Sequence, residues 1–261
     1  MGIYQANIYS EALGMYTDLY AYLPQDEPSK RKQGKPDVLI LLHGITGDAS
    51  SWTRRTKLEA LVEKYNIAVF MPSGGRSFYH NMQDGPEYLT YISEELPKII
   101  YNTFNVNEGR DHLIIAGLSM GGHGAMLAGL THPETIGFIG SFSAIYRIND
   151  YINEIKNNLT DPNHQKARAD FKLIFGNDYE RIDEGDLHNL LKDKCKGIMP
   201  NIYISCGSED ILLNESRRFH DSLSKSGVKY QYEEFTGNHE WNFWAVSLER
   251  MLASFFDGDK Q

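Results

Sequence analysis

The pentapeptide GLSMG at positions 117–121 carries the clearest chemical signal in the chain. It follows an apolar run at 113–116 and precedes a stretch of small residues, an order that predicts a strand, a sharp turn and a helix. A serine on such a turn is presented to a substrate, and the glycines two positions to either side remove Cβ atoms that would collide there. We therefore predict that Ser119 is a catalytic nucleophile.

A serine hydroxyl attacks a carbonyl carbon efficiently only when an imidazole accepts its proton, and a carboxylate must orient that imidazole. Where the nucleophile lies on this kind of turn, the chain order is serine, acid, histidine. Asp210 fits the acid, since it follows the apolar run 202–206 through a short turn. Glu209 is the competing acid.

His239 fits the base, because it follows the last strand-like run, 230–235, and precedes a helical pattern. His43 is the alternative base, but it comes before Ser119 and so breaks the expected order. The other histidines are interpreted as surface or packing residues: His80, His112, His123, His132, His164, His188 and His220.

Two backbone N–H groups are predicted to stabilise the negative charge that develops on the substrate oxygen. One belongs to Met120, which follows the nucleophile and lies where a helix N-terminus leaves N–H groups free. The other belongs to Ile45 in the loop HGITG at 43–47, where Gly44 provides room.

Several large aromatic residues lie near the same loops and are candidates for the wall of a substrate pocket. Core packing is the commoner role of such residues, so each of them has this second interpretation. The candidates are Trp52, Phe78, Tyr79, Trp241 and Trp244.

The charge of the 261-residue chain excludes several classes of partner. Its 26 Lys and Arg residues against 35 Asp and Glu residues give a formal net charge of −9. No basic stripe offsets this charge, so nucleic acid and anionic membranes are poor partners. Apolar runs such as 38–42 are far shorter than the roughly 20 residues that span a bilayer, so we expect no membrane association.

Cys195 and Cys206 form no CxxC pair, and the sequence predicts neither a disulfide framework nor a zinc site. No secretory signal is evident at the N-terminus, and Ala6 does not fit the myristoylation pattern. We expect a cytoplasmic protein that needs no metal or other cofactor.

Alternating strand-like and helical patterns must bring the candidate residues together. Apolar runs predict strands at 4–9, 15–23, 38–42, 67–71, 113–116, 136–142, 202–206 and 230–235, the first two as antiparallel edge strands. Helical patterns cover 52–65, 88–104, 122–130, 214–226 and 241–256, with a kink or restart near Pro97. This alternation predicts an α/β fold, with a mostly parallel central sheet and helices on both faces.

Residues 147–200 interrupt the alternation with a polar, mostly helical segment before the acid-bearing strand. Two interpretations are open: a solvated helical excursion that merely packs on the body, which surface loops tolerate at little cost, or a cap that shapes the substrate entrance. We expect a single domain over 1–261, with 147–200 as a helical insertion in it.

The segments HGITGDASSW, GLSMGGHGA, GSFSA, CGSED and GNHEWNFW resemble the esterase D group of α/β-hydrolases. This group includes S-formylglutathione hydrolases, tributyrin esterases, and feruloyl and acetylxylan esterases. The HGITG loop and the HEWNFW segment are most similar to the tributyrin-esterase-like members. The resemblance implies the α/β-hydrolase fold, a catalytic triad of Ser119, Asp210 and His239, and an oxyanion hole formed by Ile45 and Met120.

We therefore expect a serine carboxylesterase that hydrolyses short-chain acyl esters or acylated sugars through an acyl-enzyme. Its partner is a small-molecule ester, and a homo-oligomer is compatible with the sequence. Feruloyl, cinnamoyl or acetylxylan esterase, S-formylglutathione hydrolase and acyltransferase are alternative activities of the same fold. A non-catalytic binding module is the alternative outside enzymes, but it would lack a triad member. Because the base must be neutral, we expect activity to fall as the pH drops through the ordinary histidine range near about 6.5.

Overall fold

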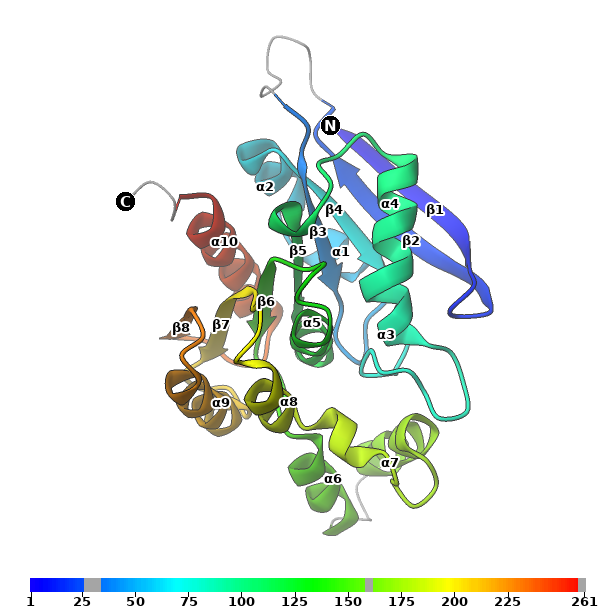
Figure 1. Ribbon diagram of the computed structural model, residues 1–261, viewed down its shortest axis with the longest axis vertical. Helices are drawn as coiled ribbons and strands as arrows, with labels where there is room; N and C mark the ends of the chain where they lie inside the picture. The colour runs from blue at the N-terminus through cyan, green and yellow to red at the C-terminus, as the bar shows by residue number, and fades with distance from the viewer. Residues whose placement is uncertain (26–33, 158–161, 258–261) are drawn as a thin grey trace.

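The computed structural model describes residues 1–25, 34–157 and 162–257. One eight-stranded sheet runs through the molecule in the order β1-β2-β4-β3-β5-β6-β7-β8 (Figure 1). Its strands are β1 (Gly2–Ser10), β2 (Met15–Leu23), β3 (Asp37–Leu42), β4 (Ile67–Pro72), β5 (Leu113–Leu118), β6 (Phe138–Phe142), β7 (Asn201–Gly207) and β8 (Tyr230–Phe235).

Strands β3 to β8 run parallel to one another, whereas β2 pairs antiparallel with both β1 and β4. The predicted mostly parallel sheet with antiparallel strands at one edge is therefore confirmed. Parallel strands place their carboxyl ends on the same edge of a sheet, where such folds assemble their sites. The loops after β3, β5, β7 and β8, which carry the predicted site residues, consequently open on one edge.

Helices cover both faces of the sheet, as predicted (Figure 1). On one face lie α1 (Ser51–Arg55), α2 (Leu58–Tyr65) and α10 (Trp241–Asp257), and on the other α4 (Leu96–Thr103), α5 (Met120–Thr131) and α9 (Leu213–Ser226). Successive residues of a strand point to opposite faces, so Leu39 and Leu41 join the first core while Ile40 and Leu42 join the second.

Two predicted helices are interrupted. The pattern over 52–65 forms α1 and α2 instead of one helix, because Thr56 has an extended backbone and bonds the carbonyl of Trp52 through its N–H and its hydroxyl. The pattern over 88–104 forms α3 (Tyr88–Thr90), a π-helical turn (Tyr91–Glu95) and α4. Pro97 lies in the first turn of α4, where its missing N–H is tolerated, so the expected restart is present.

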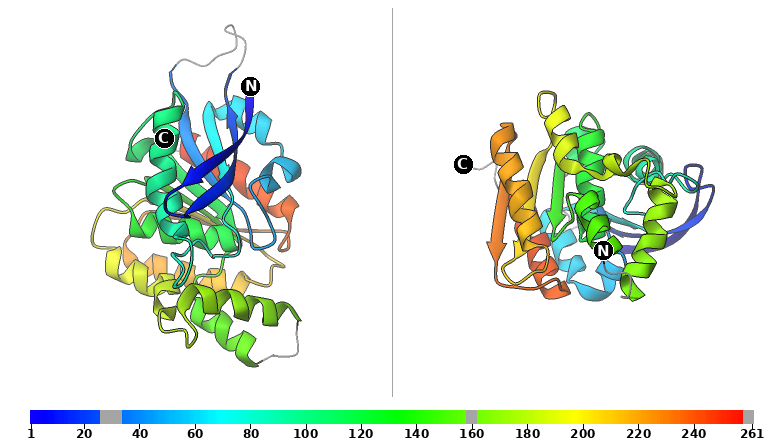
Figure 2. Two further views of the ribbon diagram at one scale, coloured as in Figure 1. Left: turned by 90° about the vertical axis from the view of Figure 1, so that its right-hand side faces the viewer. Right: turned by 90° about the horizontal axis from the view of Figure 1, so that it is seen from below.

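The segment between β6 and β7 is helical, as the sequence indicates. It contains α6 (Ile148–Asn157), α7 (Pro162–Phe175), a 3-10 turn (Ile182–Gly185) and α8 (Leu187–Lys194), and residues 158–161 lie outside the described part of the chain. Figure 2 shows α6 and α7 at one end of the molecule, beyond the carboxyl ends of the strands. Within the described ranges, no helix has the length and apolar character needed to cross a bilayer.

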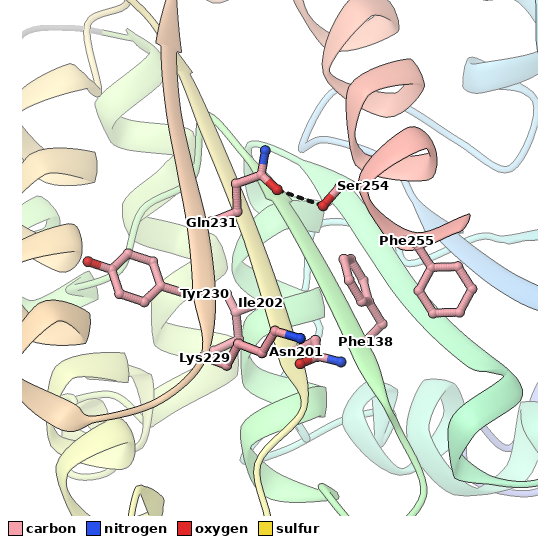
Figure 3. A pocket seen from close by; sticks show the side chains of 8 residues that line it. All are labelled: Phe138, Asn201, Ile202, Lys229, Tyr230, Gln231, Ser254 and Phe255. Carbon is pink, nitrogen blue, oxygen red and sulfur yellow. Dashed lines mark hydrogen bonds between the residues drawn. The ribbon is translucent and has the colours of Figure 1, made fainter. Parts of the chain in front are cut away.

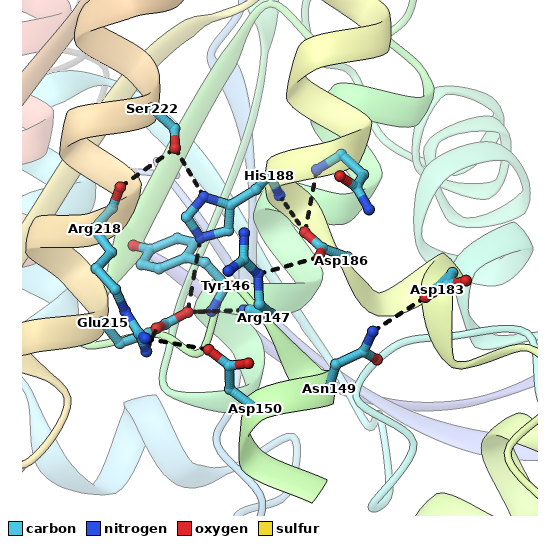
Figure 4. A network of polar contacts seen from close by, with 11 residues as sticks. Tyr146, Arg147, Asn149, Asp150, Asp183, Asp186, His188, Glu215, Arg218 and Ser222 are labelled. Atoms are coloured by element: carbon cyan, nitrogen blue, oxygen red, sulfur yellow. Dashed lines mark hydrogen bonds and ion pairs between the residues drawn. The ribbon is translucent and has the colours of Figure 1, made fainter. Parts of the chain in front are cut away.

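Glu215 of α9 fastens the start of this helical segment to the body of the molecule (Figure 4). Its Oε1 accepts the N–H groups of Tyr146 at 3.1 Å and Arg147 at 2.8 Å, and its Oε2 pairs with Arg218. Arg218 also pairs with Asp150 of α6 at 3.1 Å. Burial raises the pKa of Glu215, but His188 and Arg218 lower it more, so the net pKa is below its usual value and the carboxylate is charged.

Candidate active site

Ser119 connects β5 to α5 with a positive φ of 53° and a ψ of −119°. Few non-glycine residues adopt a positive φ, and here it produces the sharp turn that presents the serine. A Cβ atom at Gly117 would lie 2.4 Å from the carbonyl oxygen of Gly121, and one at Gly121 would lie 2.5 Å from that of Leu42. Glycine is therefore the residue that fits at both positions.

The ring of His239 lies between Ser119 and Asp210. Its Nε2 is 3.1 Å from Ser119 Oγ, and its Nδ1 is 3.1 Å from Asp210 Oδ2 and 3.2 Å from Oδ1. Since an ionised carboxylate only accepts hydrogen bonds, Nδ1 carries the proton and Nε2 is left to accept the serine proton. The structure thus brings the three predicted residues into one hydrogen-bonded chain from hydroxyl to carboxylate.

Asp210 is held by the turn after β7. Its side chain is 0% exposed, and its Oδ1 also accepts the N–H of Leu212 at 2.8 Å. Burial raises the pKa of Asp210, but the hydrogen bonds from His239 and Leu212 lower it more, so the net pKa is below the usual value. Glu209, the competing acid, is exposed and instead accepts a bond from Asn238 at 3.4 Å.

The predicted oxyanion donors lie beside Ser119. Met120 N–H is the first of α5, and neither it nor Ile45 N–H has a hydrogen-bond acceptor among the described residues. Gly44 approaches Ser119 closely, since a Cβ atom on Gly44 would lie 3.6 Å from the Cβ of Ser119. Two unpaired N–H groups next to a nucleophile form the arrangement that stabilises a developing oxyanion.

His43 is not brought to the nucleophile. It is buried, its Nδ1 donates to the carbonyl of Gly44 at 2.7 Å, and its Nε2 accepts the N–H of Gly74 at 2.9 Å. Burial lowers the pKa of His43, and the bond to Gly44 only partly offsets this, so the ring is neutral. His43 therefore fixes the shape of the loop that carries Ile45, instead of competing with His239 as the base.

A cleft with a volume of about 470 Å³ opens above Ser119. Trp241 and Trp244 line it, as expected from the sequence, and the ring of Trp244 contacts that of His239 edge to face at 5.0 Å. The complete lining comprises Gly44, Ile45, Thr46, Gly47, Ser51, Arg54, Arg55, Leu118, Ser119, His239, Glu240, Trp241 and Trp244.

Three aromatic residues proposed from the sequence for this wall do not line the cleft. Trp52, Phe78 and Tyr79 are at most 2% exposed and pack in the core. Trp52 directs its Nε1 to the carbonyl of Leu42 at 3.0 Å, and the Tyr79 hydroxyl accepts the N–H of His43 at 3.1 Å. They lie near these loops, as expected, but on the side of the core and not in the cleft.

The polar side of the cleft was not predicted from the sequence. Arg54 and Arg55, at the end of α1, both line it. Arg54 bonds Ser50 and Asp48, whereas Arg55 has no ion-pair partner among the described residues. The spacing of these arginines after HGITG was the available signal, because α1 follows the oxyanion loop directly.

A second pocket, of about 280 Å³, lies beside the starts of β7 and β8 and the end of α10 (Figure 3). Its lining includes Asn201, Lys229, Gln231 and Ser254 but no histidine. It is at the opposite edge of the sheet from Ser119 and does not contribute to the site above.

A family model described as "Putative esterase" matches residues 10–255. The chain belongs to this esterase family. The esterase is 34% identical over 254 residues to a protein named acetyl esterase from Caldicellulosiruptor saccharolyticus, and the match covers 94% of each chain. An S-formylglutathione hydrolase of Paracoccus denitrificans (strain Pd 1222) is 28% identical over 235 residues, which cover 82% of this chain and 76% of that one.

Among solved structures, the esterase is similar to substrate-bound FphF, a fluorophosphonate-binding serine hydrolase of Staphylococcus aureus. The TM-score is 0.84 with 29% sequence identity, and 98% of each chain is covered. Together with the sheet order, these matches show that the esterase has the α/β-hydrolase fold and hydrolyses esters. The resemblance to the esterase D group is confirmed.

Proposed function

We propose that this esterase is a serine carboxylesterase whose triad is Ser119, His239 and Asp210. The observation that carries the proposal is the pair of 3.1 Å contacts that the His239 ring makes with the Ser119 hydroxyl and the Asp210 carboxylate. Hydroxyl, imidazole and carboxylate in this order make a nucleophile, a base and an orienting group.

In the proposed reaction, Ser119 Oγ attacks the ester carbonyl carbon while its proton passes to His239 Nε2. The N–H groups of Ile45 and Met120 stabilise the oxyanion. His239 then returns the proton to the leaving alcohol, and the acyl group stays on Ser119. Water, deprotonated by His239, attacks the acyl-enzyme and releases the acid.

We propose small acyl esters, including acylated sugars, as the substrate class. The cleft of about 470 Å³ has the size of a small-molecule site, and its mixed lining of tryptophans and arginines suits a small acyl group with a polar alcohol. The name of the 34% identical relative, acetyl esterase, supports a short acyl group. Because of the net charge of −9, we expect nucleic acid and anionic membranes to be poor partners.

The proposed setting is a reducing one, the cytoplasm, and it fits the two cysteines. Cys195 and Cys206 are both free thiols. Free thiols are usual where glutathione keeps cysteines reduced. A homo-oligomer stays a proposal that a mass measurement in solution would decide.

The test is hydrolysis of nitrophenyl acetate, butyrate and octanoate, acetylated xylose, methyl ferulate and S-formylglutathione by the wild-type protein and Ser119→Ala. We expect acetate and butyrate to give the highest kcat/KM and Ser119→Ala to lose at least about 10³-fold. Wild-type turnover by Ser119→Ala would overturn the mechanism, and a preference for the ferulate or the thioester would overturn the substrate class. Product analysis with added alcohol separates hydrolysis from acyl transfer.

A further inference from the structure

Helix α7 packs on the loop that follows β4, residues 73–80, here called the support loop. The ring of Phe78 lies 4.9 Å from that of Phe171, and the ring of His80 lies 4.9 Å from that of Phe175. All four side chains are buried. The helical segment therefore has a fixed contact with a loop of the hydrolase body.

The support loop in turn holds the oxyanion loop, residues 43–47. Gly74 donates its N–H to His43 Nε2 at 2.9 Å. The hydroxyl of Tyr79 accepts the N–H of His43 at 3.1 Å and donates to its carbonyl at 3.2 Å. The fit is tight, because a Cβ atom at Gly74 would lie 2.2 Å from the ring of Tyr79.

Arg76 of the support loop bonds both helix α7 and the oxyanion loop. Its Nε and Nη2 both bond Asp170 Oδ2 of α7, at 2.9 Å and 2.7 Å, and its Nη1 donates to the carbonyl oxygen of Ile45 at 3.4 Å. The Asp170 side chain is 17% exposed and that of Arg76 is 40% exposed, so the carboxylate is partly shielded from water while the guanidinium lies at the surface. A planar guanidinium with several fixed donors suits such a bridge better than an ammonium group does.

We propose that Arg76 is a positioning residue for the oxyanion hole, which uses its pair with Asp170 to hold Ile45 in place from helix α7. This inference rests on the proposed function, in which Ile45 N–H binds the oxyanion. It gives the helical segment a role in catalysis: the position of α7 sets the direction of one of the two donors.

The expected effect lies in the chemical step. Contacts that act on the oxyanion are stronger in the transition state than with bound ester, so their loss lowers kcat more than it changes KM. Losing a whole donor costs about 10²- to 10³-fold in kcat. A donor that is only loosened should cost less, and we expect about a 10-fold loss for Arg76→Gln and about a threefold loss for Asp170→Asn.

The experiment measures kcat and KM for nitrophenyl acetate, and the Ki of butylboronic acid, for Arg76→Gln, Arg76→Lys, Asp170→Asn and the double variant Arg76→Gln with Asp170→Asn. Butylboronic acid forms a tetrahedral adduct with a serine hydroxyl and so reports on the oxyanion hole. The matched control is Asp150→Asn, which removes the ion pair of α6 with Arg218 in the same helical segment. Thermal unfolding is measured for every variant, and Ser119→Ala is assayed beside them.

The proposal predicts that kcat falls and Ki rises by similar factors at nearly constant KM. The double variant should be no worse than Arg76→Gln, because the two residues act as one unit. The Asp150→Asn control should match the wild type in kcat and Ki. The proposal is overturned if Arg76→Gln matches this control, or if it raises KM at unchanged kcat. If Arg76→Gln does not fold, the same comparison is made with Asp170→Asn. Turnover by Ser119→Ala would instead overturn the proposed function itself.

Discussion

At the scale of single residues, burial separates the members of the proposed triad. The Asp210 side chain is 0% exposed, whereas 27% of the His239 side chain is exposed. The base can therefore reach substrate and water, while the acid is shielded from solvent. A shielded carboxylate fixes both the tautomer and the direction of the imidazole.

Asp210 is the residue that orients the base in the proposed triad. Asp210→Asn keeps the size of the side chain but presents an amide to Nδ1, which favours the wrong tautomer of His239. We expect kcat to fall by about 10³- to 10⁴-fold, as such a change does in other triads. Glu209→Gln, in the same turn but exposed, is the control and should stay within about twofold. Equal losses in both variants would contradict the assignment.

A second residue-scale feature is the buried pair His80 and His123, whose Nε2 atoms are 2.9 Å apart. His123 Nδ1 lies 2.8 Å from the carbonyl of Ile145 and so carries the proton, which leaves Nε2 to accept from His80. Burial lowers the pKa of His123 to about 4, and burial together with His123 lowers that of His80 well below its usual value. Both rings are neutral at pH 7.

This pair predicts the direction of an acid effect on stability. Below about pH 6.5 these histidines become protonated in the unfolded chain but not in the folded chain. The free energy of unfolding therefore decreases as the pH is lowered. For His123 the fall spans pH 6.5 to about 4 and amounts to about 3 kcal/mol. Urea unfolding at several pH values gives the free energy of unfolding as a function of pH. Its slope against pH should be shallower in His123→Asn than in the wild type, and identical slopes would contradict this prediction.

Much of the site could be predicted because its residues depend on local sequence. Ser119 is marked by flanking glycines, and Asp210 and His239 each follow a recognisable strand. The supporting contacts were not predictable, because the partners of His43 and Arg76 are distant in sequence and depend on how loops pack. The placement of His164 stays untested, since its side chain lies outside the described part of the chain.

At the scale of elements, the turn between β5 and α5 depends on close packing against β3. The carbonyl of Leu42 lies where a Cβ of Gly121 would be, so Gly121→Ala must push α5 away from β3. We expect a loss of about 3 kcal/mol in stability and a large loss of activity, measured by urea unfolding and ester hydrolysis. Gly197→Ala meets only an ordinary contact at 3.5 Å and is the control. Normal activity in Gly121→Ala would contradict the geometry.

The attachment of the helical segment to α9 predicts another difference in stability. Glu215→Ala leaves the N–H groups of Tyr146 and Arg147 without their acceptor in a buried place, which should cost about 3 kcal/mol. Glu234→Ala removes an exposed pair with Arg217 and should cost clearly less than Glu215→Ala. Chemical unfolding of both variants tests this, and equal costs would show that Glu215 does not anchor the segment.

Element positions were predicted well where apolar runs were long and less well where a single residue decided. The sheet strands followed from buried runs that have few alternative structures. The end of α1 was missed because it depends on the extended backbone of Thr56 and its two bonds to Trp52, which periodicity does not report. Likewise, the sequence indicated a kink or restart near Pro97 but not the π-helical turn that precedes it.

At the scale of the whole molecule, the parallel sheet explains how residues 45, 119, 210 and 239 meet. Each follows a different strand of one sheet, and all of these strands end on the same edge. The single-domain assignment for 1–261 and the role of 147–200 as a cap remain predictions. Helix α7 packs on the support loop, as both interpretations allow, and among the described residues none from 147–200 lines the cleft above Ser119.

The proposed function depends on Ser119 as the nucleophile and His239 as its base. The most direct measurement is peptide mass spectrometry after reaction with a fluorophosphonate, with labelling rates for the wild type, Ser119→Ala and His239→Ala. We predict one adduct on Ser119, no adduct in Ser119→Ala and labelling at least about 10²-fold slower in His239→Ala. An adduct on another residue, or unchanged labelling in His239→Ala, would contradict the account.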